Sequence, residues 1–237
     1  MKYLLTAIFL IHAIVMSSQN IYGVSGVIYT PDAYAVGNGK MVLTASAHND
    51  QFALPAKDIG RIGQWAVALN FGLHSRIEAG IRLVGVPSLN YKVTTLPYHF
   101  TTDRNVNLKF IIFKEKTMLP QLAIGIQDFA GTRKFNCTAL VLGKNITLKK
   151  GPCLILNLGY GTRLSKILYD YPPDGYRLQG VFGSIGIQYP WVKVLGEYES
   201  GSFNAGIELL VMKSVSIKLF YSASKYPGAL ASFSADL

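Results

Sequence analysis

The sequence predicts an all-β protein, a closed antiparallel transmembrane β-barrel of about twelve strands preceded by an N-terminal signal peptide. Three observations lead to this fold class. Apolar residues recur at every second position in segments of about ten residues, and the connections between segments are of two lengths. Half of the residues are hydrophobic and 15% are charged. Beyond roughly the first twenty residues, however, no apolar run is long enough to form a spanning helix. The hydrophobicity is therefore expected to reside in strands.

The N-terminus has the pattern of a secretory signal. Lys2 precedes an apolar run at residues 3–16, and small polar residues follow. The run is about 14 residues long, which favours cleavage over an anchor helix because a spanning helix needs roughly 20 residues. We place the cut between Ser17 and Gly23. No cysteine lies near this point, which disfavours a lipoprotein.

The chain thus divides into three parts. Residues 1–18 are the signal peptide, with an end between 17 and 23. Residues 19–38 form a segment expected in the periplasm or in the barrel lumen. Residues 39–237 form the barrel itself, since the alternating pattern starts near Gly39 and continues to the last residue.

The strands are expected from period-two alternation. At residues 64–73, Val67, Leu69 and Phe71 lie on one face, and small or polar residues such as Asn70 lie on the other. Segments of this kind begin near Lys40, Gln64, Arg76, Asn105, Pro120, Phe135, Pro152, Arg177, Trp191, Phe203, Val215 and Gly228. An even number of strands suits a closed antiparallel barrel.

The connections support an outer-membrane barrel. Short turns are expected at residues 73–75, 188–190 and 212–214, and longer loops at residues 50–63, 87–104 and 162–176. Such barrels keep short turns and both chain ends on the periplasmic side and place longer loops outside. Aromatic residues at or near strand ends suit the two interfaces: Tyr160, Tyr189, Trp191, Tyr198 and Tyr221.

Charged and polar residues on the other face of the strands are candidates for lining the lumen. They are Glu78, Arg82, Asn107, Lys109, Asp128, Lys144, Lys193, Glu197, Glu208 and Lys218. Burying any one charge unpaired would cost several kcal/mol. These groups must therefore pair and plug the lumen, or line water and form a pore; we favour pairing.

The residues give little support to an enzyme, a metal centre or a cofactor site. Cys137 and Cys153 have no CxxC or histidine partners, so we expect buried or lipid-facing thiols. His48, near the outer end of the first strand, could meet a serine of the last strand, as in lipid-hydrolysing barrels. The net charge of +10 is spread over turns and loops. We therefore expect contact with lipopolysaccharide or an acidic polysaccharide and no nucleic-acid binding.

Several segments resemble one family. Residues 26–33, Gly-Val-Ile-Tyr-Thr-Pro-Asp-Ala, followed by Gly39-Lys40, are similar to the opening of the YjbH-like outer-membrane family, which is linked to exopolysaccharide production. Residues 70–80, 123–132 and 196–206 resemble later pieces of that family, in the expected order. The positions that carry the resemblance are Gly26, Thr30, Pro31, Ala33, Asp128, Gly131, Glu197 and Asn204.

The resemblance implies a non-enzymatic outer-membrane barrel involved in the production, secretion or assembly of surface polysaccharide. Its surroundings would be outer-membrane lipid and lipopolysaccharide, and its expected partners are polysaccharide and periplasmic export components. Two alternatives stay open: a general diffusion porin or scaffold barrel without glycan specificity, and an outer-membrane lipid hydrolase.

Overall fold

A computed structural model describes residues 18–48, 64–87, 100–131, 136–148, 151–162, 178–199, 201–223 and 225–237. The strands are β1 (Lys40–His48), β2 (Gln64–His74), β3 (Ile77–Pro87), β4 (Phe100–Phe113), β5 (Gln121–Gly131), β6 (Cys137–Thr147), β7 (Cys153–Thr162), β8 (Gly180–Gln188), β9 (Val192–Glu199), β10 (Ser202–Met212), β11 (Val215–Ser222) and β12 (Tyr226–Asp236). Nearly all of the predicted signal peptide, and most of the longer predicted loops, lie outside the described residues.

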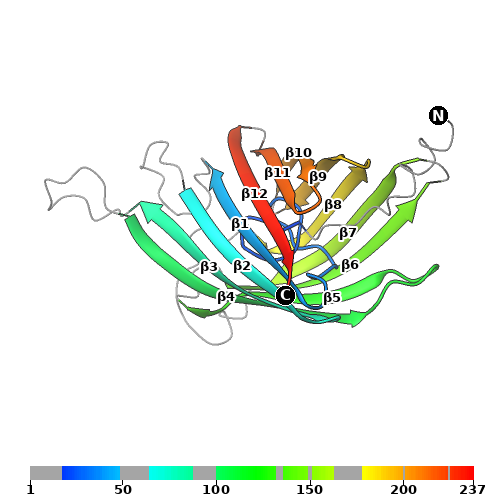
Figure 1. The fold of residues 1–237 in the computed structure, drawn as a ribbon, viewed down its shortest axis with the longest axis horizontal. Helices are drawn as coiled ribbons and strands as arrows, with labels where there is room; N and C mark the ends of the chain where they lie inside the picture. The colour runs from blue at the N-terminus through cyan, green and yellow to red at the C-terminus, as the bar shows by residue number, and fades with distance from the viewer. Residues whose placement is uncertain are drawn as a thin grey trace, which may run out of the picture.

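The strands form one closed antiparallel barrel, as the alternation predicts (Figure 1). Each strand pairs with its neighbours in sequence, and β1 closes the sheet against β12 through pairs from Lys40↔Asp236 to His48↔Gly228. Closure leaves no strand edge unpaired, which a lipid environment requires because lipid offers no hydrogen bonds. Within the described ranges, no helix has the length and apolarity needed to cross a membrane.

The predicted strand starts agree with the structure to within three residues, except at β4. β4 begins at Phe100 rather than near Asn105, because its pairing with β3 extends to Pro87↔Phe100. The polar run Thr101–Arg104 hides this extension in the sequence. The loop predicted at residues 87–104 is correspondingly shorter.

The outward face of the barrel is apolar. Its exposed side chains include Leu43, Val67, Ile81, Leu83, Leu140, Leu142, Leu158, Ile185, Val194, Ile207, Ile217 and Leu219. Exposed aromatic residues lie near the strand ends. We call the end of the barrel where the longer loops are predicted the loop end and the opposite end, with the short turns, the turn end. Trp65, Tyr160, Tyr198, Phe203 and Tyr221 lie at the loop end, and Phe113, Tyr189 and Trp191 lie at the turn end. A continuous apolar band of this kind is far larger than the patches that soluble monomers expose, and with flanking aromatics it is typical of a membrane barrel.

The N-terminal segment fills the inside of the barrel. Residues 18–36, which we call the plug, lie among the strands, as the blue segment before β1 shows in Figure 1. Two isolated bridges shape the plug, Gln19↔Ser25 and Gly26↔Pro31. Its buried apolar side chains pack with inward residues of the wall in one cluster: Ile21, Tyr22, Val27, Ile28, Tyr29 and Ala33 with Phe182, Leu195, Phe220 and Leu230.

The chain passes from the plug into β1 at the turn end of the barrel. A Cβ at Gly72 would collide with the Gly37 carbonyl, so glycine is needed where the chain crosses β2. The Gly39 amide donates to the Gly72 carbonyl at 2.9 Å, and the Leu237 amide donates to the Gly39 carbonyl at 2.7 Å. These hydrogen bonds join the residue before β1 to β2 and to the residue after β12.

Candidate functional site: the plug and its contacts with the barrel wall

Glu197 on β9 binds three consecutive residues of the plug. Its Oε1 accepts a hydrogen bond from the Tyr29 amide at 2.8 Å, and its Oε2 accepts from the Ile28 amide at 3.0 Å and the Thr30 amide at 3.2 Å. The Thr30 hydroxyl also donates to Oε2 at 2.8 Å, and Asn204 Nδ2 donates to Oε1 at 2.8 Å. Alternation along β9 points Glu197 inward, where it is buried. A carboxylate with five donors is well satisfied without a cation.

Glu78 on β3 binds the plug in the same way. It accepts hydrogen bonds from the Ser25 amide and the Val36 amide, both at 2.9 Å, and from the Ser25 hydroxyl. Because Ser25 and Val36 lie in different parts of the plug, one carboxylate holds both parts against the same strand.

Two buried lysines bind carbonyl groups of the plug. Lys109 on β4 donates to the carbonyls of Asp32 at 3.0 Å and Tyr34 at 2.7 Å, and also to Ser25. Its ammonium pairs with the Asp32 carboxylate at 3.1 Å. Lys218 on β11 donates to the carbonyls of Gln19 at 3.0 Å and Val27, with a longer contact to Gly26. The plug therefore presents amides to the acids and carbonyls to the bases.

Side-chain amides complete the contacts. Asn107 on β4 donates to the Tyr22 carbonyl at 2.8 Å and the Gly23 carbonyl at 3.0 Å. Three further wall residues contact the plug. Asn70 donates to Gln19 Oε1 and Gln121 donates to the Ala33 carbonyl, whereas Asn157 accepts from the Ala33 amide. These three were not among the predicted site residues. Their inward position in the alternation was the signal that could have identified them.

Asp128 and Arg82 lie in the lumen near the loop-end half of the plug. Strict alternation would point Asp128 outward with Ile126, but a bulge against Asn107 and a φ of 49° turn it inward, where it is fully buried. The Asp128 amide donates to Asn107 Oδ1 at 2.9 Å. The Arg82 guanidinium lies 5.6 Å from the centre of the Tyr22 ring, a cation–π contact with the plug.

Lys144 does not line the lumen, contrary to our expectation. Alternation along β6 buries Gly143 and places Lys144 on the face of the exposed Leu142. Near the end of the strand its ammonium bends back to the turn before β5, where it donates to the Lys116 carbonyl at 2.5 Å and pairs with Glu115 at 3.1 Å. Lys144 therefore stabilises a turn rather than the plug.

The exit of the plug is fixed at the same turn. The Tyr34 hydroxyl donates to Glu115 Oε2 at 2.7 Å. Burial, together with this hydrogen bond to Glu115, raises the pKa of Tyr34 well above its usual range. The phenol therefore stays protonated and keeps donating.

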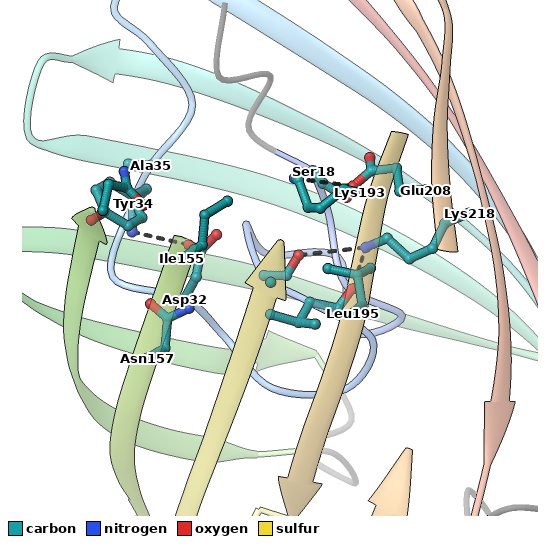
Figure 2. A pocket seen from close by; sticks show the side chains of 14 residues that line it. Ser18, Asp32, Tyr34, Ala35, Ile155, Asn157, Lys193, Leu195, Glu208 and Lys218 are labelled. Carbon is teal, nitrogen blue, oxygen red and sulfur yellow. Dashed lines mark hydrogen bonds and ion pairs between the residues drawn. The ribbon is translucent and has the colours of Figure 1, made fainter. Parts of the chain in front are cut away.

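A cavity of about 310 Å³ lies between the plug and the wall. Figure 2 shows Ser18 with Lys193, Glu208 and Lys218 on one side and Tyr34 and Ala35 on the other. Lys193 Nζ and Glu208 Oε2 form an ion pair at 3.2 Å. All four charged wall residues predicted on β9, β10 and β11 thus point inward. Glu197 and Lys218 bind the plug, whereas Lys193 and Glu208 bind each other.

The positions that carry the family resemblance fall mainly in the plug and at its contacts. Gly26 and Pro31 form the bridge that closes the plug's central turn, Thr30 binds Glu197, and Ala33 lies against β5 and β7 through Gln121 and Asn157. On the wall, Asn204 supports Glu197. Gly131 has a φ of 129° at the end of β5, where a Cβ would collide with the Arg104 carbonyl.

The remaining candidates for chemistry lie apart. His48 is buried, its ring is 6.4 Å from that of Tyr29, and the residue opposite it on β12 is Gly228 rather than a serine. Cys137 is buried and Cys153 half-buried, at opposite ends of the hairpin of β6 and β7, and both are free thiols. Among the described residues, no group of three or more His, Cys, Asp or Glu side chains could hold a metal ion.

Solved structures with a similar fold are outer-membrane barrels. A KdgM porin matches with 7% identity over 84% of this chain and 99% of the porin, at a TM-score of 0.48. The outer membrane phospholipase A of Escherichia coli matches with 10% identity over 89% and 94%, at 0.39. An outer membrane channel of Pseudomonas putida F1 matches with 9% identity over 89% and 100%, at 0.43. Similarities at this level carry no functional conclusion for this chain.

Sequence comparison is more specific. No curated protein sequence matches the chain. One family model matches residues 18–167, more than half of the chain, including the whole plug and the wall residues Glu78, Lys109 and Asn107 that bind it. The chain belongs to the YjbH family, described as exopolysaccharide biosynthesis protein YbjH.

Proposed function

We propose that the protein is exported to the outer membrane and acts there in the production of exopolysaccharide, as a barrel component of its secretion or assembly. Membership of the YjbH family supports the role, and the apolar outward band supports the location. The observation that carries the mechanism is the plug: the wall residues that bind it are buried side chains from β2, β3, β4, β5, β7, β9 and β11.

The seated plug argues against a general diffusion porin. In a water-filled pore the inward charges would be solvated, whereas here Glu78, Glu197, Lys109 and Lys218 are all buried and bound to the backbone of the plug. Removing the plug would take away the backbone partners of these charges unless water or a ligand replaced them. The resting barrel is therefore closed.

A polysaccharide has the chemistry to replace the plug. Its hydroxyl groups donate to carboxylates and accept from lysines, which are the two tasks that the plug's amides and carbonyls perform. An acidic sugar would in addition pair with Lys109 or Lys218. We therefore propose that the plug keeps the lumen sealed and that the same wall residues contact glycan when the plug is displaced.

The test combines a phenotype with conductance. Cells that lack the protein should lose most surface polysaccharide, and the wild-type chain should restore it. In planar bilayers the refolded wild-type barrel should be silent, and a chain without residues 19–36 should conduct and be blocked by acidic oligosaccharide. Normal polysaccharide in the deletion strain, or wild-type conductance equal to that of the shortened chain, would overturn the proposal.

A further inference from the structure

Ser18, the first residue that the structure describes, is already packed in the lumen. Ser18 and Gln19 are both buried. The Ser18 carbonyl accepts a hydrogen bond from the Gly26 amide at 2.8 Å, and the Gln19 carbonyl accepts from Lys218 at 3.0 Å. Asn70 donates to Gln19 Oε1 at 3.1 Å. A cut after Gln19 or further along the chain would remove these contacts from the plug.

Ser18 also lies next to an acidic group with space around it. It lines the 310 Å³ cavity together with Glu208 and Lys193. Figure 2 shows the three residues grouped on one side of the cavity. Any charge formed on Ser18 would therefore face the Glu208 carboxylate.

Buried acids outnumber buried bases in the part of the chain that the structure describes. Among the described residues, the fully buried acids are Glu78, Asp103, Asp128, Glu197, Glu199 and Glu208, and the fully buried bases are Arg82, Lys109 and Lys218. The half-buried residues Asp32, which pairs with Lys109, and Lys193, which pairs with Glu208, add one charge of each sign. Glu208 Oε2 pairs with Lys193, and Glu208 Oε1 has no hydrogen-bond partner among the described residues, so a cation beside this carboxylate is electrostatically favourable.

We propose that signal cleavage occurs between Ser17 and Ser18 and that the new α-ammonium group of Ser18 becomes part of the lumen by pairing with Glu208. This inference rests on the proposed export. Ser17 supplies the small residue expected just before the cut, with Val15 two positions earlier. Hydrolysis adds water across the peptide bond: the Ser17 carbonyl carbon takes the hydroxyl and leaves as a carboxylate, and the Ser18 nitrogen takes the protons.

Processing and closure of the barrel are coupled in this scheme. Before cleavage the Ser18 nitrogen is a neutral amide attached to the apolar signal, which must remain with the export machinery. After cleavage it is a cation on a short free end, and it is drawn to Glu208. The plug therefore makes its last wall contact only in the mature chain.

The first test is the mass of the intact protein extracted from outer membranes of cells that express the full chain. A mass that corresponds to a chain beginning at Ser18 supports the proposal. A mature chain in the outer membrane that begins at any other residue overturns this inference and leaves the proposed function standing. A chain that does not reach the outer membrane overturns both.

The second test is a double-mutant cycle between Glu208 and the position of the N-terminus. Gly-Ser-Gly is inserted between Ser17 and Ser18 so that the mature end is displaced, and Glu208→Gln is made in both the native and the extended chain. The measured quantity is the fraction of time that the barrel conducts in a planar bilayer. Lys193 loses its partner in both backgrounds, so its contribution cancels.

An ion pair between the terminus and Glu208 predicts unequal effects. Glu208→Gln should raise the conducting fraction about tenfold more in the native chain than in the extended chain, within the range of coupling found for paired charges. Equal effects in the two backgrounds would show that Glu208 acts only on Lys193 and would overturn the pairing.

Discussion

Thr30 of the plug and Glu197 of β9 are 167 residues apart in the sequence and are joined by two hydrogen bonds, from the Thr30 amide at 3.2 Å and the Thr30 hydroxyl at 2.8 Å, to the same carboxylate oxygen. Both residues belong to segments that carry the family resemblance. The contact joins the two segments in space and satisfies the buried Thr30 amide and hydroxyl.

Glu197→Gln should loosen the plug without disturbing the barrel. The amide oxygen still accepts hydrogen bonds, but the Nε2 group would face plug amides that are themselves donors. The loss should be about 2 kcal/mol, which raises the conducting fraction in planar bilayers roughly thirtyfold. Asp236→Asn is the control, because Asp236 is exposed and only weakly paired with Lys40 at 3.8 Å. If both variants remained as silent as the wild type, Glu197 would not hold the plug.

Gly143→Val should prevent the plug from seating. A Cβ at Gly143 would lie 2.6 Å from the Cβ of Ala33, so a larger side chain pushes the plug off β6. Gly125→Val is a matched control, because Gly125 also points inward on neighbouring β5 and a Cβ there meets nothing within 4 Å. We expect protease added to the folded barrel to cut the plug in the Gly143 variant only. Equal protection of both variants would contradict the close contact.

Ile185→Lys should destabilise the barrel in lipid. Ile185 is 48% exposed near the middle of β8, and a lysine facing the bilayer core costs about 2–4 kcal/mol. Met212→Lys is the control. Met212 is also exposed, but it lies at the turn end of β10, where the cost of a lysine falls to about 0–1 kcal/mol. The measurement is the midpoint of urea unfolding in lipid vesicles. Similar midpoints for both variants would show that Ile185 does not face the bilayer core.

His48→Ala should have no effect on lipid hydrolysis. The ring lies inside the barrel against Tyr29, and no serine is opposite it on β12. A histidine that activates a nucleophile must be within hydrogen-bond reach of it. Release of fatty acid from a fluorescent phospholipid should stay at background for both wild type and variant. Hydrolysis by the wild type that His48→Ala abolishes would restore the lipid hydrolase alternative.

The sequence was sufficient for the barrel because its signals are local. Alternation with period two at residues 64–73 is visible without knowledge of any partner strand, and twelve such segments require closure in a membrane. The same rule assigned the inward side of Glu78, Glu197 and Lys218. Two predicted lumen residues show where the rule needs care. Asp128 lies in the lumen only because a bulge turns it inward, whereas Lys144 lies on the outward face that alternation along β6 gives it.

What the tertiary structure alone decided is where residues 18–36 lie. The sequence left this segment in the periplasm or the lumen, and it left the inward charges to pair or to line water. No local pattern could choose, because the plug contacts wall residues up to 199 positions away and has no regular period of its own. In the folded barrel the amides and carbonyls of the plug satisfy Glu78, Glu197, Lys109 and Lys218, and it is this long-range hydrogen bonding that holds the plug in the lumen.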